Sequence, residues 1–178
     1  MKKVILVFMV VGQSLLSQAQ KYSTESSAIS FFSDGAIEDI YGRNSKSVSI
    51  FNMATGDVAF SIPIKDFEFD KSLMKEHFNE KYMETEKFPK ATFQGKITGF
   101  QNTATGEQQA KAAGKLTIHG VTNDIDVPGT VELVKGKWVM KSKFMVKLVD
   151  YKITIPQLLW QNLAEEIEVK IEFTYKAQ

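Results

Sequence analysis

The sequence predicts an all-β domain with one added α-helix near residues 70–83, behind a short export signal. Three observations lead to this prediction. Most segments alternate apolar and charged residues, which is the pattern of β-strands with one buried face. Short turns separate these segments, which favours antiparallel pairing. One stretch instead repeats its apolar residues every four positions, as an amphipathic helix does. A chain of 178 residues with this organisation is most simply a single domain.

The start of the chain has the parts of a secretory signal peptide. Lys2 and Lys3 precede a short apolar run, and the small residues that end at Ala19 fit a cleavage site. We therefore expect residues 1–19 to be removed and residues 20–178 to form the domain. The apolar run is short for a membrane span, and there is no cysteine to carry a lipid. The sequence thus predicts an exported protein, periplasmic or extracellular, without a stable membrane anchor.

Charge and cysteine content exclude several function classes. Without Lys2 and Lys3, 20 of the 22 basic residues remain against 21 acidic ones, a net charge of −1. A protein that binds nucleic acid usually has a strongly basic face, so we expect no nucleic-acid partner. The chain has no cysteine, which excludes disulfides, thiol nucleophiles and cysteine zinc sites.

Three segments before the helix are predicted as strands. The first is 28–33, with the polar residues 21–27 as a frayed entry. The second, 48–53, ends in a hairpin turn at 54–57. The third, 58–64, places four apolar side chains on one face. Its proline, Pro63, cannot donate to a ladder and is expected near the strand end.

The helical segment has one apolar face. Met74, Phe78 and Tyr82 recur at intervals of four residues, and Leu73 and His77 lie beside them. We expect this face to turn towards the apolar sides of the strands, so that the helix acts as a lid or plug. If a ligand enters the domain, we expect it to pass this helix.

Two features set the ends of the predicted helix. Asp70 or Ser72 is a suitable N-cap, because either side chain can accept a hydrogen bond from a free helix N–H group. Pro89 stops the helix and favours an extended conformation for the residue before it.

Five segments after the helix show the same strand alternation. They are residues 91–100, 111–119, 125–133, 138–148 and 167–175, and Lys135-Gly136 forms a two-residue turn between the third and the fourth. A closed barrel would remove the exposed edges and turn every apolar face inward. A β-sandwich would produce a similar sequence, so the alternation leaves both architectures open.

Two motifs resemble the signatures of a known family. Glu76-His77-Phe78, then Tyr82 and residues 87–93 (Lys-Phe-Pro-Lys-Ala-Thr-Phe), are similar to the central signature of the YceI-like family. Residues 114–122 (Gly-Lys-Leu-Thr-Ile-His-Gly-Val-Thr) resemble its second signature. The resemblance covers about 21–176. It implies an exported, lipocalin-like antiparallel β-barrel of about eight strands with an added helix, and a long apolar pocket that binds polyisoprenoid lipids such as an isoprenoid quinone.

The chain departs from the family pattern at two places. Many members open with a tryptophan and an aspartate followed by a His-Ser pair on the first strand, and residues 24–32 contain none of these. The late Arg-x-x-(Phe/Tyr)-Gly element is represented only by residues 144–151, which lack both arginine and glycine. These departures concern the identity of the ligand and the way its head group is held.

No motif predicts catalysis or metal binding. His77 and His119 are the only histidines and lack the spacing of a metal site, and His119 beside Gly120 is expected to be a turn residue that hydrogen-bonds locally. There is no G-x-S-x-G element for a serine nucleophile. We therefore expect a non-enzymatic protein with no metal and no cofactor beyond a bound isoprenoid lipid.

Two other functions remain open at this point. A small envelope hydrolase or isomerase would use rim carboxylates such as Glu76 or Glu80, with His77 or a second titratable group facing them across a cleft. A ligand-free envelope stress or interaction module would have a solid interior and an apolar patch on its outer surface. The sequence does not indicate the oligomeric state, and a dimer is left open.

The predicted binding site is the apolar interior of the barrel. A solid barrel shares the same alternation, and it is the family resemblance that favours a hollow one. His77 and Arg43 are the candidates to meet a polar head group, although a solvated surface position is the simpler interpretation of Arg43. The predicted apolar lining consists of Phe60, Ile62, Leu73, Met74, Phe78, Tyr82, Phe93, Ile118, Trp138, Phe144, Val146 and Phe173.

Overall fold

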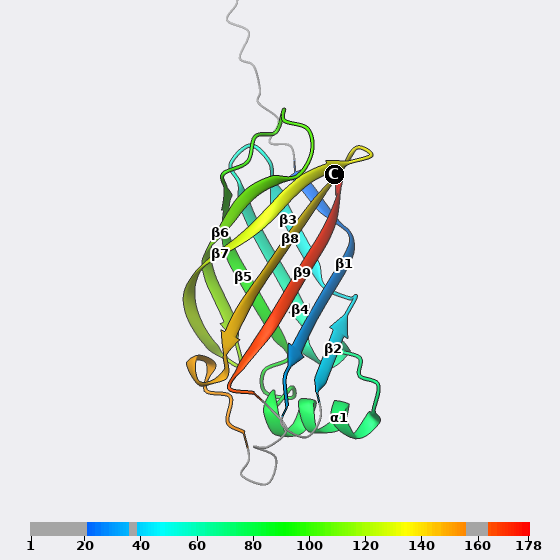
Figure 1. The fold of residues 1–178 in the computed structure, drawn as a ribbon, viewed down its shortest axis with the longest axis vertical. Helices are drawn as coiled ribbons and strands as arrows, with labels where there is room; N and C mark the ends of the chain where they lie inside the picture. Colours follow the sequence, from blue (N-terminus) through cyan, green and yellow to red (C-terminus); the bar gives the residue numbers. More distant parts are fainter. Residues whose placement is uncertain (1–20, 36–38, 156–163) are drawn as a thin grey trace, which may run out of the picture.

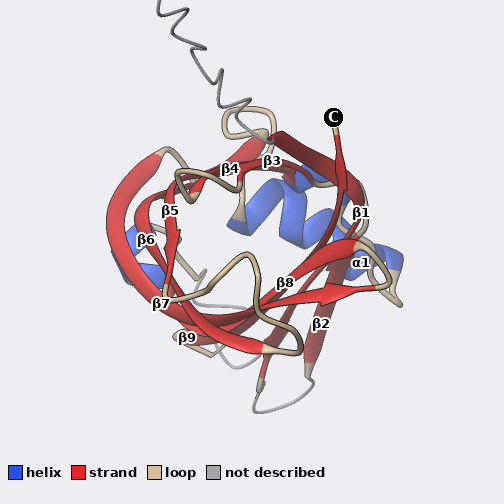
Figure 2. Ribbon diagram, turned by 90° about the horizontal axis from the view of Figure 1, so that it is seen from above, coloured by secondary structure: helices blue, strands red, loops and turns tan. Residues whose placement is uncertain are grey.

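The computed structural model describes residues 21–35, 39–155 and 164–178. The predicted signal peptide lies outside these residues. Within these ranges, nine antiparallel strands form one sheet that closes on itself (Figures 1 and 2). They are β1 (Lys21–Ser33), β2 (Ile40–Asn44), β3 (Val48–Asn52), β4 (Asp57–Pro63), β5 (Lys90–Thr98), β6 (Gln108–Ile118), β7 (Val121–Val134), β8 (Lys137–Lys147) and β9 (Glu166–Ala177).

The pairing of β1 decides between barrel and sandwich. Its first residues pair with β3 on one edge, and most of its length pairs with β9 on the other. These two pairings close eight strands into a ring, while the short β2 pairs with the second half of β1. The predicted eight-stranded antiparallel barrel is confirmed, and the sandwich is excluded.

The first half of β1 corrects one prediction. Residues 21–27 are not a frayed entry but regular strand, with Tyr22 opposite both Phe51 of β3 and Ala177 of β9. Tyr22 is the one apolar side chain in this stretch, so no alternation marks it as a strand, and a bulge between Thr24 and Ser26 shifts its register. Backbone pairing on both sides holds this segment in place even though its side chains are mostly polar.

The helical segment crosses the lower end of the barrel, in the orientation of Figure 1. It consists of α1 (Ser72–His77) and a π-helical turn, η2 (Phe78–Tyr82), so the added helix near residues 70–83 is confirmed. The predicted N-cap is wrong, because Lys71 occupies that position and makes no capping bond through its side chain. Asp70 instead lies 3.7 Å from the Arg43 guanidinium.

The upper end of the barrel is closed by large side chains. Phe51 and Tyr175 have ring centroids 5.9 Å apart, and Trp138 packs edge-on against Phe100. Phe51, Trp138 and Tyr175 are almost fully buried. The barrel therefore has packed rings at its upper end and the helix across its lower end, and any internal space lies between them.

Candidate functional site

The lower half of the barrel contains an apolar cavity of about 110 Å³. The helix forms its floor through Met74, Phe78 and Tyr82. The walls come from the inward faces of the strands, because alternate residues of a strand point to the same side. They include Ile29, Phe31, Ile40, Ile62, Ala91, Ile118, Val146, Ile167 and Val169.

Four phenylalanine rings pack together where the helical segment meets this cavity. Phe31 stacks on Phe78 with ring centroids 5.4 Å apart and planes inclined by 16°. Phe67 and Phe69 lie at 5.4 and 5.0 Å from Phe78, in tilted arrangements. Such pairs add to the free energy gained by burial alone. We refer to Phe31, Phe67, Phe69 and Phe78 as the phenylalanine cluster.

A second apolar cavity, of about 60 Å³, lies higher in the barrel. Its lining includes Phe60, Phe93, Phe144 and Phe173. Neighbouring inward residues of one strand line different cavities: on β4, Ile62 lines the lower cavity and Phe60 the upper one. The two spaces are therefore stacked along the barrel axis.

Tyr175 lines the upper cavity, and its hydroxyl group is hydrogen-bonded within the barrel. Its phenol oxygen lies 2.7 Å from Ser49 Oγ, which also donates to the carbonyl oxygen of Ala59 at 3.0 Å. Burial raises the pKa of Tyr175, and the hydrogen bond with Ser49 lowers it by less, so the phenol stays neutral.

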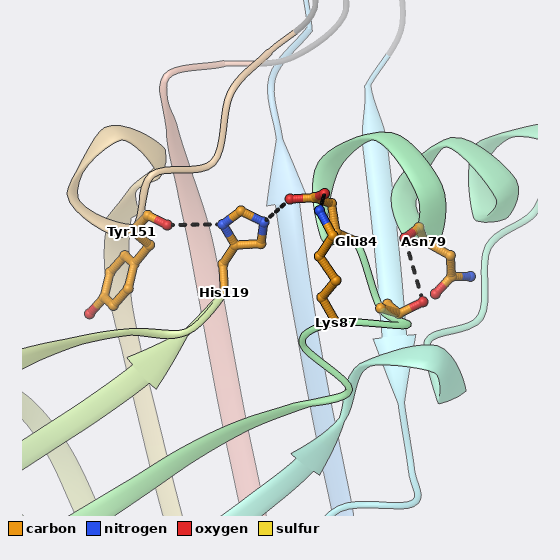
Figure 3. A network of polar contacts seen from close by, with 6 residues as sticks. Asn79, Glu84, Lys87, His119 and Tyr151 are labelled. Atoms are coloured by element: carbon orange, nitrogen blue, oxygen red, sulfur yellow. Dashed lines mark hydrogen bonds and ion pairs between the residues drawn. The ribbon is translucent and has the colours of Figure 1, made fainter.

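A polar contact network fixes the helical segment to the barrel rim (Figure 3). His119, in the turn between β6 and β7, places Nε2 at 3.1 Å from Glu84 Oε2 and Nδ1 at 3.2 Å from the carbonyl oxygen of Tyr151. Both partners are acceptors, so a neutral ring can donate to only one, whereas a protonated ring donates to both. Lys87 also bonds Glu84, and this hydrogen bond is the main cause that lowers the pKa of Glu84.

This network corrects the expectation for His119. The residue is in a turn, with φ of 50°, as predicted. Its hydrogen bonds are not local, however, because Tyr151 and Glu84 lie 32 and 35 residues away in the chain. We call the contacts of His119 with Glu84 and Tyr151 the latch.

Ten of the twelve predicted lining residues surround the two cavities. The lower cavity is lined by Ile62, Met74, Phe78, Tyr82, Ile118 and Val146, and the upper one by Phe60, Phe93, Phe144 and Phe173. Trp138 is buried near the upper end of the barrel but lines neither cavity. Whether these side chains contact a ligand stays a prediction.

Leu73 and the head-group candidates lie elsewhere. Leu73 is 59% exposed, contrary to the expectation that it turns inward, because the buried face of the helix runs through Met74 and Phe78 and Leu73 is rotated away from it. His77 is half-buried and lines neither cavity. Arg43 is exposed on β2 and pairs with Glu68 and Asp70, which agrees with a solvated surface position.

Sequence reasoning missed three members of the phenylalanine cluster. Phe31 and Phe67 line the lower cavity, and Phe69 packs against Phe31. The alternation of Ile29 with Phe31 in the first predicted strand was the available signal for Phe31. Phe67 and Phe69 alternate with the acidic Glu68 and Asp70, and this short alternation was the available signal for them.

Two features are absent from the part of the chain that the structure describes. Over residues 21–35, 39–155 and 164–178, no cluster of three or more histidine or acidic side chains is arranged to hold a metal ion. None of the helices in these ranges is long and apolar enough to cross a membrane.

Comparisons with known proteins agree with the fold. Residues 21–175 match the model of the YceI-like domain family. A polyisoprenoid binding domain from Saccharophagus degradans, implicated in plant cell wall breakdown, superposes with a TM-score of 0.77 at 16% identity, covering 88% of this chain and 98% of that one. No curated relative matches the chain in sequence.

Two further solved structures are similar. BcnA of Burkholderia cenocepacia has a TM-score of 0.70 at 19% identity, over 83% of this chain and 95% of its own. The YceI protein of Campylobacter jejuni has a TM-score of 0.53 at 18% identity, over 100% and 99% of the two chains. At these identities the structures establish the shared barrel fold.

Proposed function

The chain belongs to the YceI-like domain family, and from this premise we propose that it is a non-catalytic protein that holds an isoprenoid lipid inside its barrel. The observation that carries the proposal is the stack of two apolar cavities along the axis of a closed barrel. An extended apolar chain fits this geometry better than a compact ligand does. The polyisoprenoid binding domain of Saccharophagus degradans, which has the same fold, supports this ligand class.

Burial of its apolar surface is enough to bind an isoprenoid chain. Each buried CH₂ contributes about 0.8 kcal/mol, so a chain of several isoprene units binds well through its apolar surface alone. The cavities are narrow, and a long chain would have to displace side chains between them. Phe60 on β4 and Ile171 on β9 line the upper cavity directly above Ile62 and Val169, which line the lower one. Rotation of such side chains would join the two spaces.

The placement of acidic side chains favours binding over catalysis. Glu76 and Glu80, the carboxylates considered for a hydrolase or isomerase, are exposed on the helical segment and line neither cavity. No acidic side chain of the described chain lines either cavity. A carrier or reservoir for a lipid such as an isoprenoid quinone, exported after removal of residues 1–19, is therefore the function that we propose.

Mass spectrometry of the protein from its native host tests the proposal. An organic extract of the purified protein is expected to contain an apolar isoprenoid in near-stoichiometric amount. A protein that yields no lipid, and that also binds none when incubated with farnesol, would overturn the proposal.

A matched pair of variants connects the result to the barrel interior. Ala112 lines the upper cavity, whereas its neighbour Ala113 points outward and is exposed. Ala112→Leu adds volume to the interior and should reduce the extracted lipid several-fold. Ala113→Leu makes the same chemical change on the outer surface and should leave the amount unchanged.

A further inference from the structure

The barrel wall is open on one side, between β7 and β8. Residues 129–134 of β7 pair with residues 137–142 of β8. Below Gly129, no ladder pair of the described chain connects β7 to β8, and the two strands diverge (Figure 1). On their other edges the two strands are paired along nearly their whole length, β7 with β6 and β8 with β9.

Pro128 and Gly129 explain where the ladder stops. Ser142 Oγ donates to the carbonyl oxygen of Pro128 at 2.7 Å, so this carbonyl faces β8. The nitrogen of a strand residue faces the same side as its carbonyl, and proline has no hydrogen to donate there. A Cβ atom on Gly129 would lie 2.5 Å from the carbonyl oxygen of Lys141, so glycine permits the close approach at this last pair.

The opening is also bounded below. The Asn123 side-chain amide donates to the carbonyl oxygen of Asp150 at 2.8 Å, which connects β7 to the short 3₁₀ helix η3 (Leu148–Tyr151). The unpaired stretch of β7 between this bond and Gly129 is about five residues, or about 16 Å of strand. We call this opening, between residues 124–128 and residues 143–147, the side window.

The upper cavity reaches the outside through the side window. Its lining includes Ile125 and Val127 from one border and Phe144 from the other, all only partly buried. Two outward-facing lysines, Lys111 and Lys141, also line it. A surface recess of about 500 Å³ adjoins the cavity and shares with it Gly129, Thr130, Lys141, Ser142 and Ile171. The upper cavity and the outer recess thus share part of their walls at this point.

The outer recess carries more positive than negative charge. Lys141, Lys143 and Lys170 border it, and Glu172 is its one acidic side chain. Lys143 and Lys170 both pair with Glu168, at 2.7 and 3.1 Å. Lys141 makes no ion pair within the described residues, although it is exposed and touches both spaces.

We propose that the side window is the entrance for the apolar chain and that an anionic head group, such as a phosphate, binds beside Lys141 with the chain in the upper cavity. This inference rests on the proposed function and adds to it the charge and the place of the head group. The lower end of the barrel offers a harder route, because the phenylalanine cluster and the latch both hold the helix in place.

Binding of two probes with the same chain tests the proposal. Farnesyl phosphate and farnesol differ only in the charge of the head group. Lys141→Gln should weaken binding of farnesyl phosphate about twofold to fivefold, the size of one exposed ion pair, and Lys141→Glu should weaken it further. Binding of farnesol should stay unchanged in both variants.

The matched control is Lys176→Glu. Lys176 is exposed on β9 and lines neither the cavity nor the recess, so this variant makes the same charge change elsewhere. If Lys141→Glu leaves the preference between the probes unchanged, or if Lys176→Glu alters it equally, the proposed head-group site is wrong and lipid binding stands. If neither probe binds the unaltered protein, the proposed function itself fails.

Discussion

The lower end of the barrel and its side window are closed to different degrees by different interactions. At the lower end, four phenylalanine rings and the latch hold the helix against the strands. At the side window, partly buried apolar side chains face each other across the stretch of β7 and β8 below Gly129, where the two strands have no ladder pair. The lower end of the barrel is therefore closed mainly by side-chain packing. The wall between β7 and β8 is instead left without backbone hydrogen bonds over part of its length, although the same strands are paired higher up.

The largest expected effect is a difference in the free energy of unfolding that is lost when a phenylalanine is removed from each of the two regions. Phe31 is 8% exposed and contacts the other three rings of the phenylalanine cluster, so Phe31→Ala should lower the free energy of unfolding by about 3–4 kcal/mol. Phe144, at the border of the side window, is only partly buried, and Phe144→Ala should cost about 1–2 kcal/mol. Denaturation in urea measures both, and equal losses would contradict the comparison.

A smaller effect is expected from the latch. His119→Asn removes the bonds to Glu84 and Tyr151 but keeps a residue type that tolerates positive φ. The free energy of unfolding should fall by about 1–2 kcal/mol, as for a hydrogen bond to a charged group. Amide hydrogen exchange should accelerate in α1 and stay unchanged in residues 130–134 of β7. Faster exchange in both regions would show that the latch does not act on the lower end alone.

The contribution of Glu84 to the stability of the fold should depend on pH in the acid range. In the folded protein the pKa of Glu84 is below its ordinary value of 4.5, first because Lys87 donates a hydrogen bond to it and also because His119 does. A carboxyl group with a lowered pKa stabilises the fold above its unfolded pKa and loses this contribution as the pH falls through the folded value. The melting temperature of Glu84→Gln should thus be lower than that of the unaltered protein at pH 7, and the difference should begin to shrink near pH 4.5 and disappear once the pH is below the folded pKa of Glu84. A difference that persists in acid would exclude this cause.

Most strands were predictable because their signal is local, whereas their closure into a barrel was expected only from the family resemblance. Alternation along each strand gave the inward faces, and the turn at Lys135-Gly136, with positive φ at both residues, was indicated by its type alone. The latch could not be predicted in the same way, because its partners are brought together only by closure of the ring. The first half of β1 was missed because its pairing partners, rather than its own side chains, keep it extended.

The side window could be predicted from the sequence only in part. Pro128-Gly129 lies inside a segment whose alternation predicts continuous strand, and this prediction is correct for its pairing with β6. Proline cannot donate a hydrogen bond to a neighbouring strand. For Pro63 this property correctly predicted a position near the end of the strand. At Pro128 the strand continues and only one of its two edges becomes free. Which edge that is depends on the carbonyl direction, which only the structure reveals.

The smallest expected effect tests whether Pro128 keeps the side window open. Pro128→Thr restores an N–H group on the edge that faces β8, where it can donate to the next residue of β8 and extend the ladder by one pair. The free energy of unfolding should change by no more than about 1 kcal/mol, the net contribution of one hydrogen bond. Release of bound farnesol should become slower, because a longer ladder narrows the opening. Pro63→Thr, at the end of β4 and away from the side window, is the matched control and should leave release unchanged. If Pro128→Thr does not slow release, the ligand does not leave through the side window, and the lower end becomes the route to test with His119→Asn.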